Sequence, residues 1–354
     1  MKKLFPYIFV AIVTLLMLFE PEASIASAKA SLILCADVIV PSLFPFFVCS
    51  GLLVHSGLCR SLAHFLEPVM KPVFNVSGCG AIAFVLGILS GYPQGAITTC
   101  NLYQSGYISK SEAERLLAFC NNAGPLFVLS AVGVATYSSP KIGVILYISH
   151  IISSVLVGVL FRFYKKQSHN APKYSINQSD LPFSEAFSNV LRDSVSNILT
   201  VCGAIVFFGT FGGLIGQFLP ENPLLKGLFS GVLELSRGNS VISSLQLPLV
   251  PKLVLSAFSV GFAGCCVHLQ VAAITSRHHL SLAPYLLGKL LHGVFSAAIT
   301  LGYLHIFRIT PAFATSVNNV GAGIFLGSFF SISALAFLVC LGIFIQKNRE
   351  ISSF

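Results

Sequence analysis

The chain has 354 residues, of which 55% are hydrophobic and 9% are charged. A soluble domain carries about a quarter charged residues, so this composition excludes an ordinary water-soluble protein. The mean hydropathy is +0.85, and several apolar stretches reach the roughly 20 residues that cross a bilayer as a helix. The sequence therefore predicts an all-α, polytopic membrane protein.

The net charge of +9 arises from 21 Lys and Arg against 12 Asp and Glu. The basic residues lie mostly between apolar stretches, as they do in cytoplasmic loops of membrane proteins. We therefore expect the lipid bilayer as a partner, and no nucleic acid. The ten cysteines contain no C-x-x-C pair, which favours small buried side chains over a disulfide framework or a metal site.

The first apolar run, from Leu4 to Phe19, follows two lysines and precedes the small residues ASIASA at positions 23–28. This layout is typical of a secretory signal, which is either cleaved or retained as an anchor. The length of the run favours a retained helix. We assign residues 1–30 to this N-terminal anchor or signal segment.

A second apolar run extends from residue 31 to about residue 59 and contains PSLFPFF at positions 41–47. Two prolines so close together remove backbone donors and predict a kink or break in the helix. Arg60 and Lys71 flank the less apolar segment that follows, and they place it on the cytoplasmic side.

The apolar stretch from Val76 to about Tyr107 contains SGYPQGA at positions 90–96, where Gly and Pro predict a turn. The basic loop at residues 162–173 marks the cytoplasm, and counting spans back from it places both ends of this stretch on the cytoplasmic side. The stretch is therefore predicted to be a re-entrant helical hairpin. Irregular backbone at membrane depth persists only inside protein or beside a polar cavity. The candidate substrate-binding residues at its tip are Ser90, Gly91, Tyr92 and Gln94.

A capping box follows at Ser109 and Glu112 and predicts a helix from about Lys110 toward Phe119. The helix then meets CNNAGP at positions 120–125, whose proline prevents regular hydrogen bonding. Two amides enter the membrane there, and two roles remain open for them: substrate contact or a cap of the broken helix. These candidates are Asn121 and Asn122.

The second half is predicted to repeat the first half in inverted orientation. A shift of 174 residues lays residues 85–99 over 259–273, which predicts a second re-entrant hairpin that inserts from the outer face. His268 and Gln270 are its candidate binding residues. Glu234 and Arg237 stand at helical spacing, and a structural latch, an interfacial ion pair or a coupling group all remain open for them.

These elements give the predicted organisation. Repeat 1 covers residues 31–165, a cytoplasmic linker 166–193, repeat 2 194–346 and a tail 347–354. Inverted repeats with broken helices place a substrate site at the bilayer centre. The predicted topology places His278 and His279 in an outer loop. It also puts the basic tail outside after a final span at residues 322–345, against the positive-inside tendency, so the direction of that span stays open.

The segments at residues 40–53, 66–80, 90–96 and 111–127 together resemble the YlbJ-type (SpoVV-type) sporulation integral membrane proteins, which belong to the nucleoside-recognition Gate group. The resemblance continues through residues 231–238 and 267–273. It implies a fold similar to concentrative nucleoside transporters. In spore formers it implies movement of dipicolinic acid across the outer forespore membrane. Gln94 and Gly124 depart from the residues expected in this family.

The resemblance thus implies a transporter of a small anionic aromatic solute in a bacterial cell membrane, while the polar residues named above do not decide between such an acid and a nucleoside. A nucleoside-like solute and a membrane scaffold for spore-envelope assembly remain alternatives, and homo-oligomerisation remains open. The chain has neither a phosphate loop nor an HExxH motif. We therefore expect no enzyme activity, no catalytic residue, no metal and no cofactor.

Overall fold

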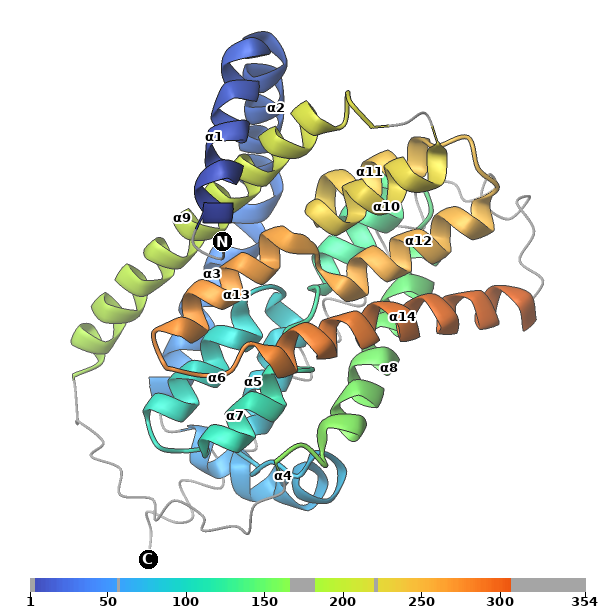
Figure 1. The fold of residues 1–354 in the computed structure, drawn as a ribbon. Coiled ribbons are helices and arrows are strands. Elements are labelled where there is room, and N and C mark those ends of the chain that lie inside the picture. The colour runs from blue at the N-terminus through green and yellow to red at the C-terminus, as the bar shows by residue number, and fades with distance from the viewer. Residues whose placement is uncertain (1–3, 56–57, 166–181, 220–221, 307–354) are drawn as a thin grey trace, which may run out of the picture. The chain divides into compact units, whose positions relative to one another are not determined.

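The computed structural model describes residues 4–55, 58–165, 182–219 and 222–306, and the regular elements within these ranges are helices (Figure 1). The α-helices are α1 Leu4–Phe19, α2 Pro21–Leu34, α3 Val40–His55, α4 Leu58–Phe74, α5 Gly80–Ser90, α6 Gln94–Gln104, α7 Lys110–Leu117, α8 Pro140–Phe161, α9 Phe183–Ile215, α10 Pro223–Leu233, α11 Leu235–Ser244, α12 Leu249–Phe262, α13 Gly264–Ser276 and α14 Ala283–Ile306. Two π-helical segments are η1 Cys35–Ile39 and η2 Leu126–Thr136.

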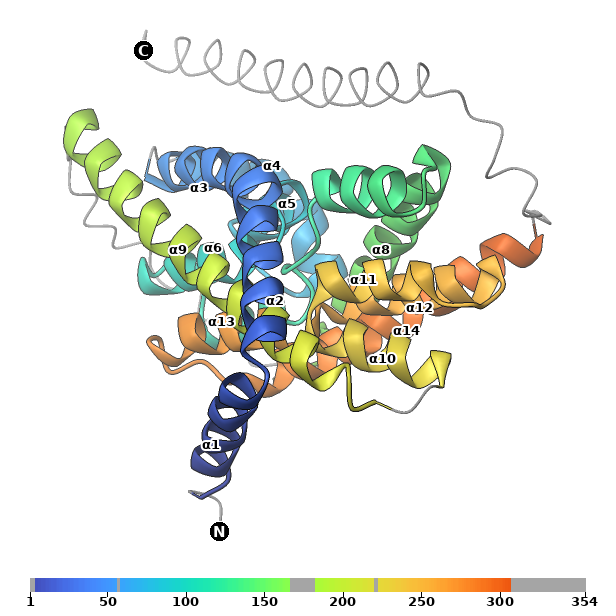
Figure 2. The same cartoon turned by 90° about the horizontal axis from the view of Figure 1, so that it is seen from above.

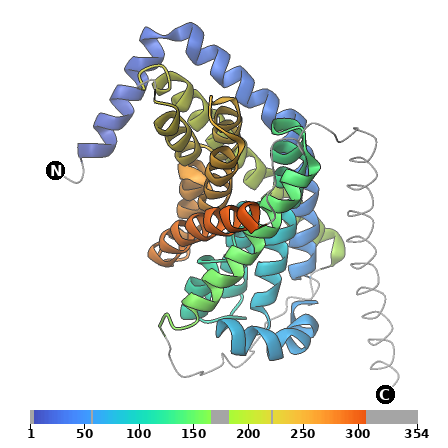
Figure 3. The ribbon, with the colours of Figure 1, turned by 90° about the vertical axis from the view of Figure 1, so that its right-hand side faces the viewer.

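Four stretches of the described chain are long and apolar enough to cross a membrane as helices. They are residues 140–161, 183–215, 249–276 and 283–306. A fifth candidate is the pair of α1 and α2 with η1, whose two parts meet at 107°. Figure 3 shows this bend where α1 turns away from α2, and Figure 2 shows α1 followed by α2 as seen from above. The predicted helical membrane protein is confirmed.

Of the kink or break predicted at residues 41–47, the break is absent. Helix α3 runs through this segment with Pro45 inside it. The irregular backbone lies one turn earlier, where η1 has the wider hydrogen-bonding pattern of a π-helix. Such π-bulges occur inside α-helices and disturb their regular ladder, so the irregularity precedes the prolines instead of interrupting the helix at them.

The predicted turn at SGYPQGA is present, because α5 ends at Ser90 and α6 begins at Gln94. The two short helices pack against each other as a hairpin. Gly91 at the turn has φ +91°, and a Cβ there would lie 2.8 Å from the backbone nitrogen of Gly124. Only glycine fits both the backbone conformation and this close approach.

The capping box is confirmed at the start of α7. The Ser109 side chain accepts a hydrogen bond from the Glu112 amide, and the Glu112 carboxylate accepts one from the Ser109 amide. After α7 the chain loses helical structure at Asn121–Gly124 and resumes it at Pro125. The predicted break at CNNAGP is therefore present, and it contacts the turn between α5 and α6 through Gly91 and Gly124.

The second hairpin predicted at residues 259–273 is wrong. Helices α12 and α13 form successive parts of one candidate span, interrupted at Ala263, which has φ +77°. A hairpin does occur in the second half, but α10 and α11 form it, packing against each other on either side of Glu234. The 174-residue shift therefore paired a hairpin with a broken helix.

Residues at similar places in the two halves of the chain, at the hairpin turns and in the long spans, are instead 142 positions apart. His150 in α8 and His292 in α14 are 142 positions apart, and the same separation relates Tyr92 to Glu234 at the two hairpin turns. Each hairpin is followed by an interrupted helix and then by a long span. The predicted final span at residues 322–345 and the tail at 347–354 lie outside the described residues, as does the part 166–181 of the predicted linker 166–193, whose residues from Phe183 onward belong to α9.

Candidate functional site

A cavity of about 70 Å³ lies where the interrupted parts of the chain meet. This volume holds a few water molecules. Its walls come from both hairpin turns, from the break after α7 and from α13, with η1, α3 and α9 closing the remaining side. The lining residues are Val38, Ile39, Leu43, Phe46, Leu89, Ser90, Gly91, Tyr92, Ala123, Gly124, Leu126, Phe127, Val201, Ile205, Glu234, Leu235, Ser236, Cys266, Val267 and Gln270.

The cavity brings together half of the candidate residues named from the sequence. These are Ser90, Gly91, Tyr92, Glu234 and Gln270. The Ser90 hydroxyl and the Gln270 side-chain oxygen are buried, and neither has a hydrogen-bond partner among the described residues. Buried polar atoms are normally paired. These two atoms are therefore available to a polar solute or to water.

The other five candidates do not line the cavity. Asn121 accepts a hydrogen bond from the Ala96 amide near the start of α6, over 3.4 Å. Asn122 donates one to the Phe119 carbonyl over 3.0 Å. Both side chains thus contact the irregular backbone, and the buried Asn122 Oδ1 has no hydrogen-bond partner among the described residues. Gln94 lies in the first turn of α6 and donates to Thr98 over 3.2 Å.

His268 lies in α13 beside Gln270 but outside the cavity lining. Its Nδ1 is 3.0 Å from the Tyr285 hydroxyl, and its ring meets the Phe262 ring edge to face. These contacts fix the ring between α12, α13 and α14. The structure therefore places His268 in packing, next to the cavity wall.

Glu234 caps the N-terminus of α11 with its own carboxylate. One oxygen accepts from the Ser236 amide at 2.9 Å, and the other accepts from the Arg237 amide at 2.7 Å. The Arg237 guanidinium donates elsewhere, to the Gly209 carbonyl at 3.1 Å. Free amides at a helix N-terminus attract anions. At this hairpin turn the protein's own carboxylate already holds them, so Glu234 has a structural role even though it lines the cavity.

A polar cluster behind Tyr92 was missed in the sequence analysis. The Lys289 ammonium is fully buried and donates to the Tyr92 hydroxyl at 3.1 Å and to the Asn121 carbonyl at 3.0 Å. It also lies 3.0 Å from His292 Nδ1. An ionisable residue in the middle of an apolar span is a functional candidate by default. Lys289 and His292 in the α14 stretch carried that signal.

His292 and His150 connect α14 to α8. Their rings lie 4.3 Å apart between centroids, and His292 Nε2 is 2.9 Å from the His150 carbonyl. His150 Nε2 accepts from the Ala123 amide at 3.0 Å, and Ala123 lines the cavity. The cluster therefore reaches the cavity wall at two places, Tyr92 and Ala123.

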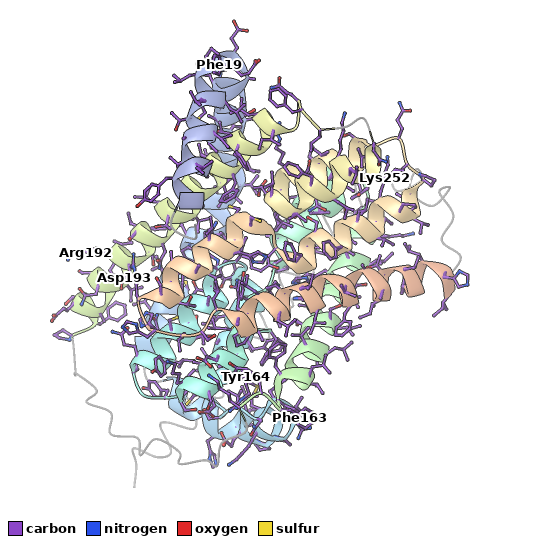
Figure 4. The ribbon with its side chains drawn as sticks, in the orientation of Figure 1. Phe19, Phe163, Tyr164, Arg192, Asp193 and Lys252 are labelled. Carbon is purple, nitrogen blue, oxygen red and sulfur yellow. The ribbon has the colours of Figure 1, made fainter. Side chains whose placement is uncertain are left out.

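A second network lies around α7, outside the candidate spans. The buried Glu114 carboxylate accepts from Lys165 Nζ at 2.8 Å, from the Tyr164 hydroxyl at 3.3 Å and from the Ser281 amide at 3.1 Å. Figure 4 labels Tyr164 near the end of α8. Burial raises the pKa of Glu114, but these hydrogen bonds outweigh burial and hold the pKa below its ordinary value. The same contact raises the pKa of Lys165.

This network corrects the predicted topology. Ser281 lies in the loop between α13 and α14, and Lys165 lies just after α8. Because one carboxylate binds both, the loop that contains His278 and His279 lies at the same face as the basic end of α8. The outer-loop prediction is wrong, since it rested on the second hairpin that the structure lacks.

No group of three or more His, Cys, Asp and Glu side chains suited to a metal ion occurs within residues 4–55, 58–165, 182–219 and 222–306. The residues that could hold a small solute are the polar and aromatic members of the cavity lining. Glu234 supplies one carboxylate to that lining, and it is committed to two backbone amides.

Comparison with known proteins identifies the family. A family model described as nucleoside recognition, Gate, matches residues 36–161, which include the first hairpin, the break after α7 and α8. The sporulation integral membrane protein YlbJ of Bacillus subtilis (strain 168) is 30% identical over 328 residues, covering 83% of this chain and 80% of YlbJ. No solved structure gives a significant match. The resemblance seen in the sequence is confirmed: the chain belongs to the family of the sporulation integral membrane protein YlbJ.

Proposed function

We propose that the protein moves a small solute across the membrane by alternately opening the cavity to its two faces. The observation that carries this proposal is the cavity itself, which is lined by two hairpin turns and an interrupted helix. Interrupted helices near the middle of a membrane protein are the usual place for a transporter's substrate site, because irregular backbone there must line a cavity or be buried in protein.

The directions of corresponding spans support an inverted repeat. Helix α8 runs toward the face that holds Glu114 and ends there, because Lys165 follows it. Helix α14 begins at that face, because Ser281 precedes it. The spans that carry His150 and His292 therefore run in opposite directions. Such opposed repeats support alternating access, in which one bundle rocks against the other.

Dipicolinic acid is the solute that we propose. It is a flat aromatic ring with two carboxyl groups on one edge, and the cavity offers Phe46, Tyr92 and Phe127 for contact with such a ring. The named relative is a sporulation protein, which is consistent with a solute of spores and with the outer forespore membrane as location. Because the cavity holds only a few water molecules, its walls must separate before such a solute enters.

A nucleoside-like solute is the second candidate. The Ser90 hydroxyl and the Gln270 oxygen are unpartnered and buried, and such neutral polar groups suit hydroxyl and amide hydrogens of a solute. The matching family model is described as nucleoside recognition. Direct measurement of the flux of a charged aromatic acid and of a neutral nucleoside distinguishes the two candidate solutes.

The test is flux into liposomes that contain the purified protein, with radiolabelled dipicolinate and uridine as probes. We expect dipicolinate flux in the wild type and a clear reduction in Gln270→Leu, which removes a polar group from the wall. Asn239→Leu serves as the matched control, because Asn239 is a buried amide outside the cavity lining. Uridine flux alone would favour the second candidate. Flux of neither probe would reject the transport proposal and favour the scaffold alternative.

A further inference from the structure

Three hydrogen-bond acceptors surround the buried nitrogen of Lys289. They are the Tyr92 hydroxyl oxygen at 3.1 Å, the Asn121 carbonyl at 3.0 Å and His292 Nδ1 at 3.0 Å. The Tyr92 hydroxyl donates its own hydrogen to the Val260 carbonyl at 2.8 Å, so its oxygen must accept from Lys289. A carbonyl oxygen can only accept. Two hydrogens of Lys289 are therefore committed to Tyr92 and Asn121.

The contact between Lys289 and His292 requires one more hydrogen. His292 Nε2 faces the His150 carbonyl at 2.9 Å, so that nitrogen must carry a hydrogen and donate it. With two hydrogens on Lys289 already directed elsewhere, the short contact with His292 Nδ1 needs a third hydrogen on either nitrogen. On Lys289 it makes an ammonium, and on His292 it makes an imidazolium. In both arrangements the pair holds one net positive charge.

The neighbouring histidine adds no second charge. His150 Nε2 accepts from the Ala123 amide at 3.0 Å, so it carries no hydrogen and the ring is neutral. Nor does a carboxylate balance the pair. Within the described ranges the ion pairs are Lys71 with Glu67 and Lys165 with Glu114. The positive charge on Lys289 and His292 is therefore buried and has no anionic partner among those residues.

A buried charge without a partner is costly, and transporters retain such charges for function. The charge here is separated from the cavity by one side chain: Tyr92 lines the cavity and contacts Lys289 through its hydroxyl, and the ammonium lies 4.9 Å from the centroid of its ring. In a region that excludes water, a fixed charge acts across such a separation with little screening. An anion in the cavity would complete the missing pair.

We infer that Lys289 and His292 together form the fixed counter-charge for an aromatic carboxylate in the cavity. This inference rests on the proposed transport function and names the residues that select an acid over a neutral solute. Lys289 acts through Tyr92 and the local field, so it is a positioning and selectivity residue. Glu234, on the wall formed by α10 and α11, repels a carboxylate of the solute. The carboxylate is therefore expected to bind at the wall near Tyr92.

The experiment compares liposome flux of dipicolinate with flux of its neutral diamide, which has the same ring and nearly the same shape. We expect Lys289→Met to lower the ratio of dipicolinate to diamide flux by about tenfold or more. A purely structural loss would lower both fluxes together and leave the ratio unchanged. Lys252→Met is the matched control, because the Lys252 ammonium binds the Ser243 carbonyl in a different part of the fold. Figure 4 shows Lys252 far from the end of α8.

The outcomes separate this inference from the proposed function. A wild type that transports dipicolinate, with an unchanged ratio in Lys289→Met, overturns the counter-charge and leaves transport intact. If Lys289→Met does not fold, Lys289→Gln takes its place, since it is also neutral and keeps an amide donor. If the wild type transports neither probe, the charge is tested by melting temperature with and without dipicolinate. If dipicolinate raises the melting temperature of the wild type but not of Lys289→Gln, the counter-charge is supported. If it raises both melting temperatures equally, the counter-charge is rejected.

Discussion

The carboxylate of Glu114 accepts a hydrogen bond from the backbone amide of Ser281 at 3.1 Å, although the two residues are 167 positions apart. This contact joins α7 to the loop that precedes α14. Because Lys165 binds the same carboxylate at 2.8 Å, three segments far apart in sequence meet at one face of the protein. The contact therefore fixes the relative directions of α7, α8 and α14.

The first prediction concerns this topology. Single cysteines placed at Phe163 and His279 in a cysteine-free background should react with a membrane-impermeant thiol reagent from the same side. A cysteine at Gln246, in the turn between α11 and α12, should react from the opposite side, because α12 and α13 cross between Gln246 and His279. If the cysteines at positions 279 and 246 react from the same side, α12 and α13 do not cross the membrane together. That result would support the re-entrant hairpin predicted from the sequence.

The second prediction concerns pH. The Glu114 contacts stabilise the ionised carboxylate, so their contribution is present above the ordinary carboxyl pKa and is lost as the pH falls through the lowered pKa of the folded protein. Glu114→Gln should therefore melt a few degrees lower at neutral pH and show a flatter decline toward acid. Melting temperature in detergent across a pH series measures this.

The control for the pH series is Glu185→Gln, because Glu185 is exposed in the first turn of α9. We expect the wild-type profile from this variant, since exposed charges contribute little to stability. An unchanged acid decline in Glu114→Gln would mean that other carboxylates control the unfolding.

The third prediction concerns the turn between α5 and α6. Gly91→Ala puts a Cβ 2.8 Å from the Gly124 backbone nitrogen at φ +91°, so both conformation and space oppose it. We expect a loss of stability above the roughly 1 kcal/mol of an ordinary left-handed alanine, together with loss of flux. Gly106→Ala measures the cost of a positive φ without a steric clash, because φ there is +73° and no atom lies within 4 Å of the added carbon. Equal effects of the two variants would rule out the close approach as the cause.

The fourth prediction concerns the Tyr92 hydroxyl. Tyr92→Phe keeps the ring but leaves Lys289 and the Val260 carbonyl each short of one hydrogen bond. An unsatisfied buried polar group costs about 1–3 kcal/mol, so the melting temperature should fall by several degrees. Tyr147→Phe loses a single, longer hydrogen bond of 3.4 Å to the Ile88 carbonyl and should fall less. A larger fall in Tyr147→Phe would contradict the importance of the Lys289 contacts.

Local sequence signals predicted the segment from α5 to η2 well, although they misplaced the irregular backbone before α3. The turn at Gly91–Pro93, the capping box at Ser109 and the break at Asn121–Gly124 each depend on residues whose backbone preferences act within a few positions. The membrane helices followed from length and hydropathy alone. These features needed no knowledge of distant contacts.

The second half was harder to predict because its turn signals do not coincide with its hairpin. The turn between α10 and α11 has neither Gly nor Pro at Leu233–Leu235, and a capping carboxylate from Glu234 makes it instead. Gly261 and Gly264 flank the interruption of a continuing helix at Ala263, whereas the 174-residue shift predicted a hairpin there. A short turn motif does not show whether the next helix reverses or continues, since packing against neighbouring helices decides that.

The site was predicted in part for the same reason. Ser90, Gly91 and Tyr92 were found because the turn that bears them is visible in the sequence. The pairing of Lys289 with Tyr92 joins positions 197 residues apart, and no local pattern indicates it. The separation of 142 residues became visible only when His150 and His292 were found in contact.

The cap that Glu234 forms on α11 has a consequence for how a solute travels. Its carboxylate accepts hydrogen bonds from the amides of Ser236 and Arg237, so in the proposed transporter it repels a carboxylate of the solute at that wall and favours the wall beside Tyr92. In the proposed transporter, a solute ring with its carboxyl groups on one edge therefore enters with that edge toward Tyr92.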